Sequence, residues 1–345
     1  MKSPWLTALF RTRPMHWGSA EMLIMRLLFA AVVLWAGIFW ELPEAAARVP
    51  KPEWLAMMDH GGAETTASPE SKSSANGLAA VAPLGWMVDT ARSPVIQILT
   101  GLTLMLYVAG MAPVLTLLPA LILMTGTGAL RNSMGDISHH TQLVAMVLLA
   151  QWIVYLTAAI RQRRERPLWL RPAHQVQEQA VFWSLLTIGA GYFASGITKL
   201  EATDFAWIQR VPSMALQVMK AVWSASYSNG EPVSGFKAVT VPGWILTYPN
   251  AARLFFGTGL LLELLGPVLV MGRRRAFWIG IALIAMHIGI SLLMDIEFRN
   301  HIFLLAIFAV NIPGLILRSD RKAAAAIEAD AGKEQPLRTA PQPPA

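Results

Sequence analysis

The sequence predicts an all-α, polytopic integral membrane protein, a helical bundle of about eight transmembrane helices. The first observation is composition: 54% of the 345 residues are hydrophobic and 14% are charged, whereas soluble domains carry roughly a quarter charged residues. The mean hydropathy of +0.46 agrees with this. The second observation is a series of apolar runs, several of which reach the roughly 20 residues that a helix needs to cross a bilayer.

The apolar runs place the helices in order along the chain. The run over residues 93–130 is too long for one span, and its Ala-Gly-Met-Ala-Pro stretch, ending at Pro113, predicts a tight turn between two helices. The other predicted helices are 22–40, about 20 residues from Thr141, the apolar run 180–198, 252–271, 276–294 and 301–317.

The segments between and beyond these runs define the predicted domain organisation. Residues 1–20 form a cytoplasmic N-terminus, 21–318 the transmembrane domain and 319–345 a disordered cytoplasmic tail rich in Ala, Pro and charge. The non-cytoplasmic side carries a flexible loop, 41–92, rich in Gly and Ser, and a longer segment, 199–250. The first apolar run is too long for a signal peptide, so no cleavable signal is expected.

The basic residues predict the topology. The net charge is +7, and Lys and Arg gather in the N-terminus, the connection 161–172, the Arg273-Arg274-Arg275 run and the end of the last helix. Because basic connections stay on the cytoplasmic side, both termini are expected in the cytoplasm. The basic character is therefore a topology signal, and no nucleic-acid partner is expected.

Neither cysteine chemistry nor a metal site is predicted. The chain has no cysteine, which excludes disulfides, thiolate zinc sites and iron–sulfur clusters. His139 and His140 follow Asp136, but adjacent residues do not point the same way on a helix, and no spaced histidine motif accompanies them. Exposure in a loop is the expected state of these two histidines.

The predicted topology brings several polar residues to the non-cytoplasmic membrane face. They come from the connection before the fourth helix, the end of the fifth helix and the connection between the last two helices. These residues are Asp136, His139, His140, Lys199, Asp295, Glu297 and His301.

Three further ionisable residues lie inside predicted spans, where charge is costly and usually faces the bundle interior. Arg26 lies about one turn inside the first helix and either snorkels to the interface or faces inward. Glu263 lies mid-span, so we expect it to line a cavity or to pair internally. His287 is either a structural histidine bonded to a carbonyl or a functional one.

Lys199 marks the end of the fifth apolar run. Tyr192, Ser195, Gly196 and Lys199 have the spacing i, i+3, i+4 and i+7, which places them on one helix face. A partly desolvated lysine can act as a base, whereas a lysine at the end of a span can also be a snorkelling anchor. The small residues of this run permit close helix approach or leave room for a ligand; they are Gly189, Gly191, Ala194 and Gly196.

These motifs resemble the vitamin K-dependent γ-glutamyl carboxylase family and its bacterial relatives with the horizontally transferred transmembrane (HTTM) domain. The signature is similar through Tyr192, Phe193, Gly196, Lys199, Leu200, Glu201 and Trp207. Other family segments are matched in the same order through Arg26, His140, Glu263 and His287. The resemblance covers about residues 20–318 and implies a location in the bacterial cytoplasmic (inner) membrane.

The resemblance implies chemistry on reduced vitamin K or another quinol. Lys199 would be the catalytic base that deprotonates the hydroquinone, and His140 would be a hydrogen-bonding or oxyanion-stabilising partner. Water must be excluded from such a site, because it would quench a strong base. The family's carboxylase has a large domain after the bundle, whereas 27 residues follow Arg318 here, and Ser138 and His139 replace two asparagines of the histidine motif. These departures favour the HTTM branch over peptide carboxylation.

Two other classes of function stay open from the sequence. The short tail after Arg318 and the altered motif residues also suit a non-enzymatic protein. Such a protein would bind lipid or quinone, or would be an accessory subunit of a periplasmic partner in the manner of DoxX-like proteins. A transporter with a relay through Glu263 and His287 is a weaker alternative, since no inverted repeat is evident. Membrane lipid is an expected partner in every case.

Overall fold

The computed structural model describes residues 15–43, 84–88, 92–133, 139–161, 172–229, 233, 235–294, 296 and 298–317. Every regular element within these ranges is a helix, in agreement with the all-α prediction. Five helices are long and apolar enough to cross a membrane. They are Ser19–Glu41 (α2, Ser19–Leu34, continued by η1, Trp35–Glu41), Pro113–Asn132 (α7, Pro113–Thr116, and most of α8, Leu118–Ser133), Thr141–Arg161 (in α9, His139–Arg161), His174–Glu201 (α10) and Arg273–Met294 (α14).

Two shorter apolar helices accompany them: α6, Ser93–Val108, and the pair α15, Arg299–Leu304, with η6, Leu305–Ala309. The helical membrane bundle is thus present. Five long helices within the described ranges fall short of the eight predicted spans.

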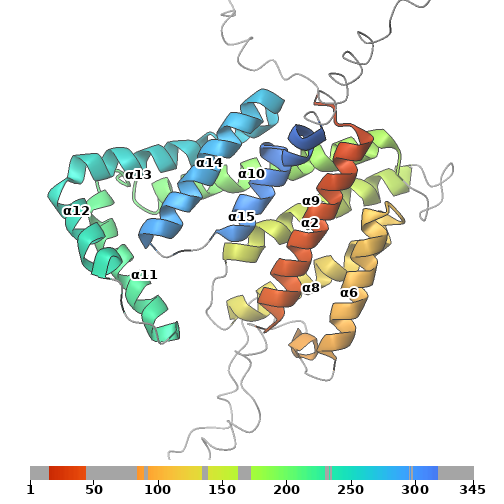
Figure 1. Cartoon of the computed structure of the whole chain (residues 1–345), viewed down its shortest axis with the longest axis horizontal. Helices are drawn as coiled ribbons and strands as arrows, with labels where there is room; N and C mark the ends of the chain where they lie inside the picture. The colour runs from red at the N-terminus through yellow and green to blue at the C-terminus, as the bar shows by residue number, and fades with distance from the viewer. Residues whose placement is uncertain are drawn as a thin grey trace, which may run out of the picture.

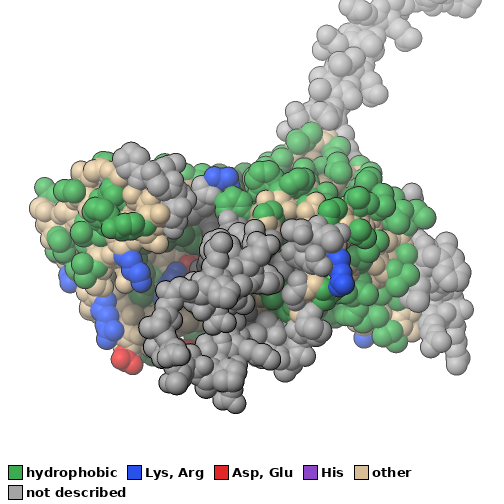
Figure 2. Space-filling view, turned by 90° about the horizontal axis from the view of Figure 1, so that it is seen from below, with side chains coloured by type: hydrophobic (Ala, Val, Ile, Leu, Met, Phe, Trp, Pro, Cys, Tyr) green, Lys and Arg blue, Asp and Glu red, His purple; other side chains and the backbone are tan. Residues whose placement is uncertain are grey.

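Large hydrophobic side chains remain on the outside of this bundle. Leu27, Ile98, Met105, Ile160 and Trp278 are all exposed, and hydrophobic groups cover much of the face in Figure 2. Apolar exposure on this scale is expected of helices whose outer surface meets lipid.

The predicted turn between the second and third apolar helices is confirmed. α6 ends at Val108, and the chain then passes through positive φ at Gly110 (76°) and at Ala112 (42°) before α7 begins at Pro113. Positive φ is uncommon for alanine, and proline suits the first position of a helix because its missing N–H has no partner there anyway. The chain reverses here, and α6 packs against α8.

α10 runs through the middle of the molecule (Figure 1). α2, α6, α8 and α9 lie toward its N-terminal part, and α11, α12 and α13 lie toward its C-terminal end. It packs against α9, against α13 (Pro249–Leu264) and against the 3-10 segment η5 (Gly266–Val270). The main core includes Phe29, Tyr107, Leu148, Leu185 and Phe308, all buried.

The segment 199–250 contains helices that the sequence analysis did not anticipate. They are α11 (Met214–Asn229), η4 (Phe236–Thr240) and α12 (Val241–Thr247). They build a small core of their own, which includes Val218, Val222 and Ile245. The signal was present in the sequence, because Val211, Ala215, Val218 and Val222 recur at helical spacing.

Two predicted helices are interrupted. The run 252–271 breaks after α13 at Leu265, where Pro267 lacks the N–H that an α-helix would require. The last run starts two residues earlier than predicted, at Arg299, and breaks at Asn311, whose φ is 59°. A short helix over 312–317 follows.

Glycines let α10 approach η5 and α13 closely, as the small-residue stretch predicted. A Cβ built at Gly189 would lie 2.6 Å from the backbone oxygen of Gly266. At Gly196 a Cβ would lie 2.9 Å from Cδ2 of Leu264 and 3.4 Å from Cβ of Glu263. A side chain at Gly189 would meet rigid backbone and push α10 away from η5, whereas at Gly196 the Leu264 side chain would have to shift.

We therefore expect Gly189→Ala to destabilise the bundle by about 1–3 kcal/mol, because the added methyl group meets rigid backbone. Gly101→Ala on α6 is the matched control, since a Cβ there meets no atom within 4 Å; it should be neutral or stabilise by up to about 1 kcal/mol through helix propensity. Denaturation of both variants in detergent measures the difference. Equal stability of the two variants would contradict the close packing of α10 on η5.

Candidate functional site

Lys199 and Glu263 form an ion pair between α10 and α13. The Lys199 Nζ donates to both carboxylate oxygens, with 2.6 Å to Oε2. Lys199 lies in the last turn of α10 rather than in the loop after it, and its side chain is 38% exposed, whereas that of Glu263 is 7% exposed. The structure shows internal pairing, which is one of the two expectations for Glu263. Lys199 therefore bonds a buried carboxylate and does not only anchor the helix end at the interface.

A second buried pair lies beside the first. The Tyr192 hydroxyl is 2.6 Å from Nε2 of His287, and both side chains are buried. The proton between them belongs to either group, depending on the histidine tautomer. Nδ1 of His287 is buried and has no hydrogen-bond partner within the described part of the chain. His287 is thus bonded to a phenol, and not to the backbone carbonyl of the structural alternative.

Two more rings enclose this pair. Phe298 lies 4.6 Å from His287 between ring centroids, and His301 lies 5.4 Å from His287 and 6.3 Å from Tyr192. Phe298 and His301 meet edge to face at 5.3 Å, a favoured arrangement of aromatic rings. The predicted outer-face residue His301 therefore joins this group, and Phe298 was missed by the sequence analysis.

The two pairs belong to one cluster. Tyr192 and Lys199 are seven residues apart and share the predicted face of α10. Tyr192 lies within electrostatic reach of Glu263, and His287 within that of Lys199. Each pair joins a proton donor to an acceptor by a hydrogen bond, so the face of α10 carries an amine, a carboxylate, a phenol and an imidazole close together.

Other predicted site residues lie outside what the structure describes. Asp136, Asp295 and Glu297 are outside the described residues, and α9 begins with His139 and His140 but their side chains are not described. The proposed partnership of Lys199 with His140 therefore stays a prediction. Within the described ranges, no group of three or more His, Asp or Glu side chains is arranged to hold a metal ion.

Arg26 faces the bundle interior, the second of its two predicted positions. It lines a cavity of about 10 Å³ together with Tyr107, Gln151 and Tyr155. The Tyr107 hydroxyl donates to Oε1 of Gln151 at 2.6 Å, and the Gln151 amide donates to Ser184 at 2.9 Å. Within the described part of the chain, no hydrogen bond or ion pair joins these residues to the Lys199 cluster, so Arg26 belongs to a separate polar centre.

A buried charge pair that the sequence analysis missed joins η1, α8 and α9. The Glu41 side chain is 0% exposed, and it accepts hydrogen bonds from Arg131 at 2.9 Å and from the Thr141 hydroxyl at 2.6 Å. Glu41 was assigned to the loop 41–92, but it ends a helix. The pair fixes the start of α9, where His139 and His140 lie. An acidic residue directly after an apolar run was the available signal.

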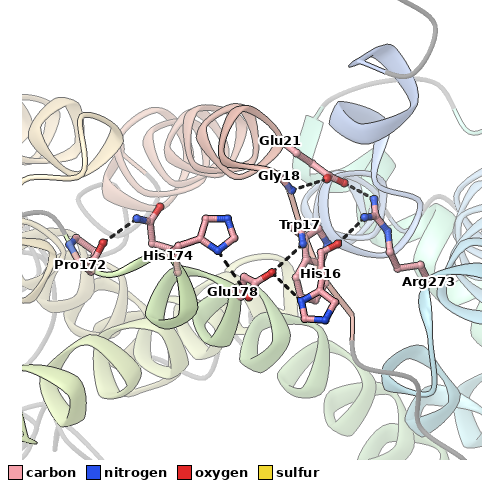
Figure 3. A network of polar contacts seen from close by, with 9 residues as sticks. His16, Trp17, Gly18, Glu21, Pro172, His174, Glu178 and Arg273 are labelled. Carbon is pink, nitrogen blue, oxygen red and sulfur yellow. Dashed lines mark hydrogen bonds and ion pairs between the residues drawn. The ribbon is translucent and has the colours of Figure 1, made fainter. Parts of the chain in front are cut away.

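A second polar network ties the beginning of the described chain to α10 and α14 (Figure 3). Glu178 accepts hydrogen bonds from the Trp17 N–H at 3.0 Å and bonds the His16 ring at 3.3 Å. Glu21 accepts from Arg273, which also donates to the His16 carbonyl at 2.7 Å. This network lies at the end of the bundle where α14 begins, which the sequence analysis predicts to be cytoplasmic.

Comparison with protein-family models gives no match, and neither the curated proteins nor the solved structures give one.

Proposed function

We propose that this chain is a membrane-embedded enzyme of the HTTM, vitamin K-dependent carboxylase-like type, with eight spans in the bacterial inner membrane and both termini in the cytoplasm. Its reaction begins with deprotonation of a lipophilic hydroquinone by Lys199 at the non-cytoplasmic face. The observation that carries the proposal is the Lys199–Glu263 pair, set beside the Tyr192–His287 pair at the end of a membrane helix.

The ion pair itself supplies a way to make a neutral amine. Without ligand, the partly exposed lysine is a solvated ammonium paired with a carboxylate. A lipophilic ring that covers Lys199 removes this water, and two charges lose much of their stabilisation in an apolar environment. Transfer of one proton from Nζ to Glu263 then leaves a neutral amine and a carboxylic acid.

The neutral amine can accept the hydroquinone O–H proton. That step breaks the O–H bond, forms an N–H bond and leaves a quinolate anion beside an ammonium group. The electron-rich quinolate is the species that molecular oxygen oxidises, in the chemistry that the resemblance implies. The rings of Phe298 and His301 are only partly buried and lie against the buried Tyr192–His287 pair, so a planar quinol can stack on these two rings.

A specific observation also supports a non-enzymatic quinone- or lipid-binding function. A cavity of about 380 Å³ is lined by Phe236, Val241, Trp244, Phe255 and Leu293, with Thr240 beside them. Neither Lys199 nor Glu263 lines it, and its surface is apolar. Such a cavity suits a hydrocarbon tail, and binding there needs no base.

Turnover of a prenylated naphthoquinol separates these functions. Protein in phosphatidylcholine nanodiscs is supplied with the quinol, oxygen uptake is followed and the products are analysed by mass spectrometry for the epoxide. A catalytic base contributes roughly 10²–10⁴-fold, so Lys199→Met should lower the rate by at least about 100-fold. Lys220→Met is the control, because Lys220 is an exposed lysine on α11.

Wild-type turnover that survives Lys199→Met unchanged would contradict the role of the lysine. A wild-type protein that binds the quinol but does not turn it over would instead support the binding function.

A further inference from the structure

A third cavity lies at the opposite end of the bundle from the Lys199 cluster. It has a volume of about 440 Å³, within the range of about 300–1,000 Å³ typical of small-molecule sites. It is enclosed by the chain before α2, the start of α14 and the segment 308–315, and Leu185 of α10 also lines it. The network of Figure 3 forms one side of it through Trp17 and Arg273.

The lining of this cavity is divided into a basic and an apolar part. Arg273 and Arg274 contribute the basic part, and Phe277, Phe308 and Leu185 contribute the apolar part. This combination fits a molecule with a charged head and a hydrocarbon chain. A neutral quinone uses only the apolar half.

The two arginines differ in their partners. The Arg273 guanidinium donates to Glu21 and to the His16 carbonyl, so its charge is already balanced by a carboxylate. Arg274 is exposed, and within the described ranges it makes no ion pair or side-chain hydrogen bond. One positive charge at the cavity is therefore uncompensated.

We infer that this cavity binds one anionic phospholipid, with its phosphate on Arg274 and an acyl chain against Phe277 and Phe308. Basic pockets between transmembrane helices bind anionic headgroups, because the lipid supplies the counter-charge and its chain fills the apolar part. Arg273 is already paired with Glu21, so it holds the start of α14 in place and is not the group that neutralises the phosphate. This inference does not depend on the proposed quinol chemistry.

The test compares phosphatidylglycerol with phosphatidylcholine on purified, delipidated full-length protein. Titrations followed by the thermal unfolding midpoint should give a larger stabilisation with phosphatidylglycerol, and native mass spectrometry should retain one such lipid per chain. Arg274→Gln should weaken phosphatidylglycerol binding about fivefold, which corresponds to about 1 kcal/mol for one basic residue. Arg274→Lys keeps the charge and should keep most of the affinity.

Arg275→Gln is the matched control, because Arg275 is the neighbouring arginine of the same helix end and does not line the cavity. It should bind phosphatidylglycerol as the wild type does. Equal stabilisation by both lipids, or equal losses in the two glutamine variants, would overturn the inference. Stabilisation by inorganic phosphate alone to the same extent would also overturn it, since the acyl chain would then contribute nothing.

Discussion

Arg131→Met is expected to destabilise the bundle by about 3–5 kcal/mol, the cost of breaking a buried ion pair from one side. The Arg131 side chain is 6% exposed and that of Glu41 is 0% exposed. Removal of the guanidinium leaves the Glu41 carboxylate in an apolar interior with the Thr141 hydroxyl at 2.6 Å as a donor. The free energy of unfolding in mixed detergent micelles measures the effect.

Glu41→Gln combined with Arg131→Met separates the contribution of the unpaired charge to the free energy of unfolding from the contribution of side-chain packing. The double variant removes both charges and should recover at least half of the loss, because replacing a buried pair costs much less than orphaning one member. Thr141→Val should cost about 1 kcal/mol, as for an ordinary hydrogen bond. A loss below about 0.5 kcal/mol for Arg131→Met would show that Glu41 does not depend on this arginine.

Lys199→Met and Glu263→Gln are expected to have unequal effects on stability. Lys199→Met leaves a buried carboxylate unpaired and should cost about 2–4 kcal/mol, somewhat less than for a fully buried pair because the lysine is partly exposed. Glu263→Gln should cost about 1 kcal/mol, because the flexible lysine can carry its charge to water. Lys199→Met is expected to cost more because it leaves Glu263, the more buried partner, without its counter-charge.

The double variant completes the thermodynamic cycle. Groups in direct contact show coupling energies of about 0.5–3 kcal/mol, and we expect a value in the upper half of that range for Lys199 and Glu263. Unfolding of the wild type, both single variants and the double variant under the same conditions gives the coupling. Additive losses would show that the two groups do not interact in the membrane-embedded protein.

The sequence predicted those features that depend on local spacing. Apolar run length located the long helices, and glycine with proline located the turn before Pro113, because both signals act over a few residues. The common face of Tyr192 and Lys199 followed from helical periodicity. That Glu263 would either line a cavity or pair internally followed from the cost of a charge inside a bilayer, and the structure shows the pairing.

Features that depend on the register between distant helices could not be predicted. His287 meets Tyr192 across 95 residues, and Arg131 meets Glu41 across 90; neither contact has a local signature. The close approach of Gly189 to Gly266 brings α10 against η5, and the sequence shows only that the residues are small. The break after Leu265 had a local signal in Pro267, but the apolar run concealed it.

The Lys199–Glu263 pair bears on both interpretations of Lys199, as an anchor at the end of a span and as a base. As an ion pair it joins α10 to α13, and in the proposed function the same pair supplies a neutral amine once a ligand covers it. The double-variant cycle tests only the role of the pair in stability, so a functional measurement has to test the role of Lys199 as a base.

Photo-crosslinking with a prenylated naphthoquinone analogue tests the location of the site most directly. The wild-type protein in nanodiscs is irradiated with the analogue, digested and mapped by mass spectrometry, with unlabelled quinol as competitor. We predict competed labelling around the end of α10 and on α14 and α15 near His287 and His301, and loss of this labelling in Lys199→Met. Labelling confined to the cavity lined by Phe236 and Trp244, or labelling unchanged in Lys199→Met, would contradict a quinol site at Lys199.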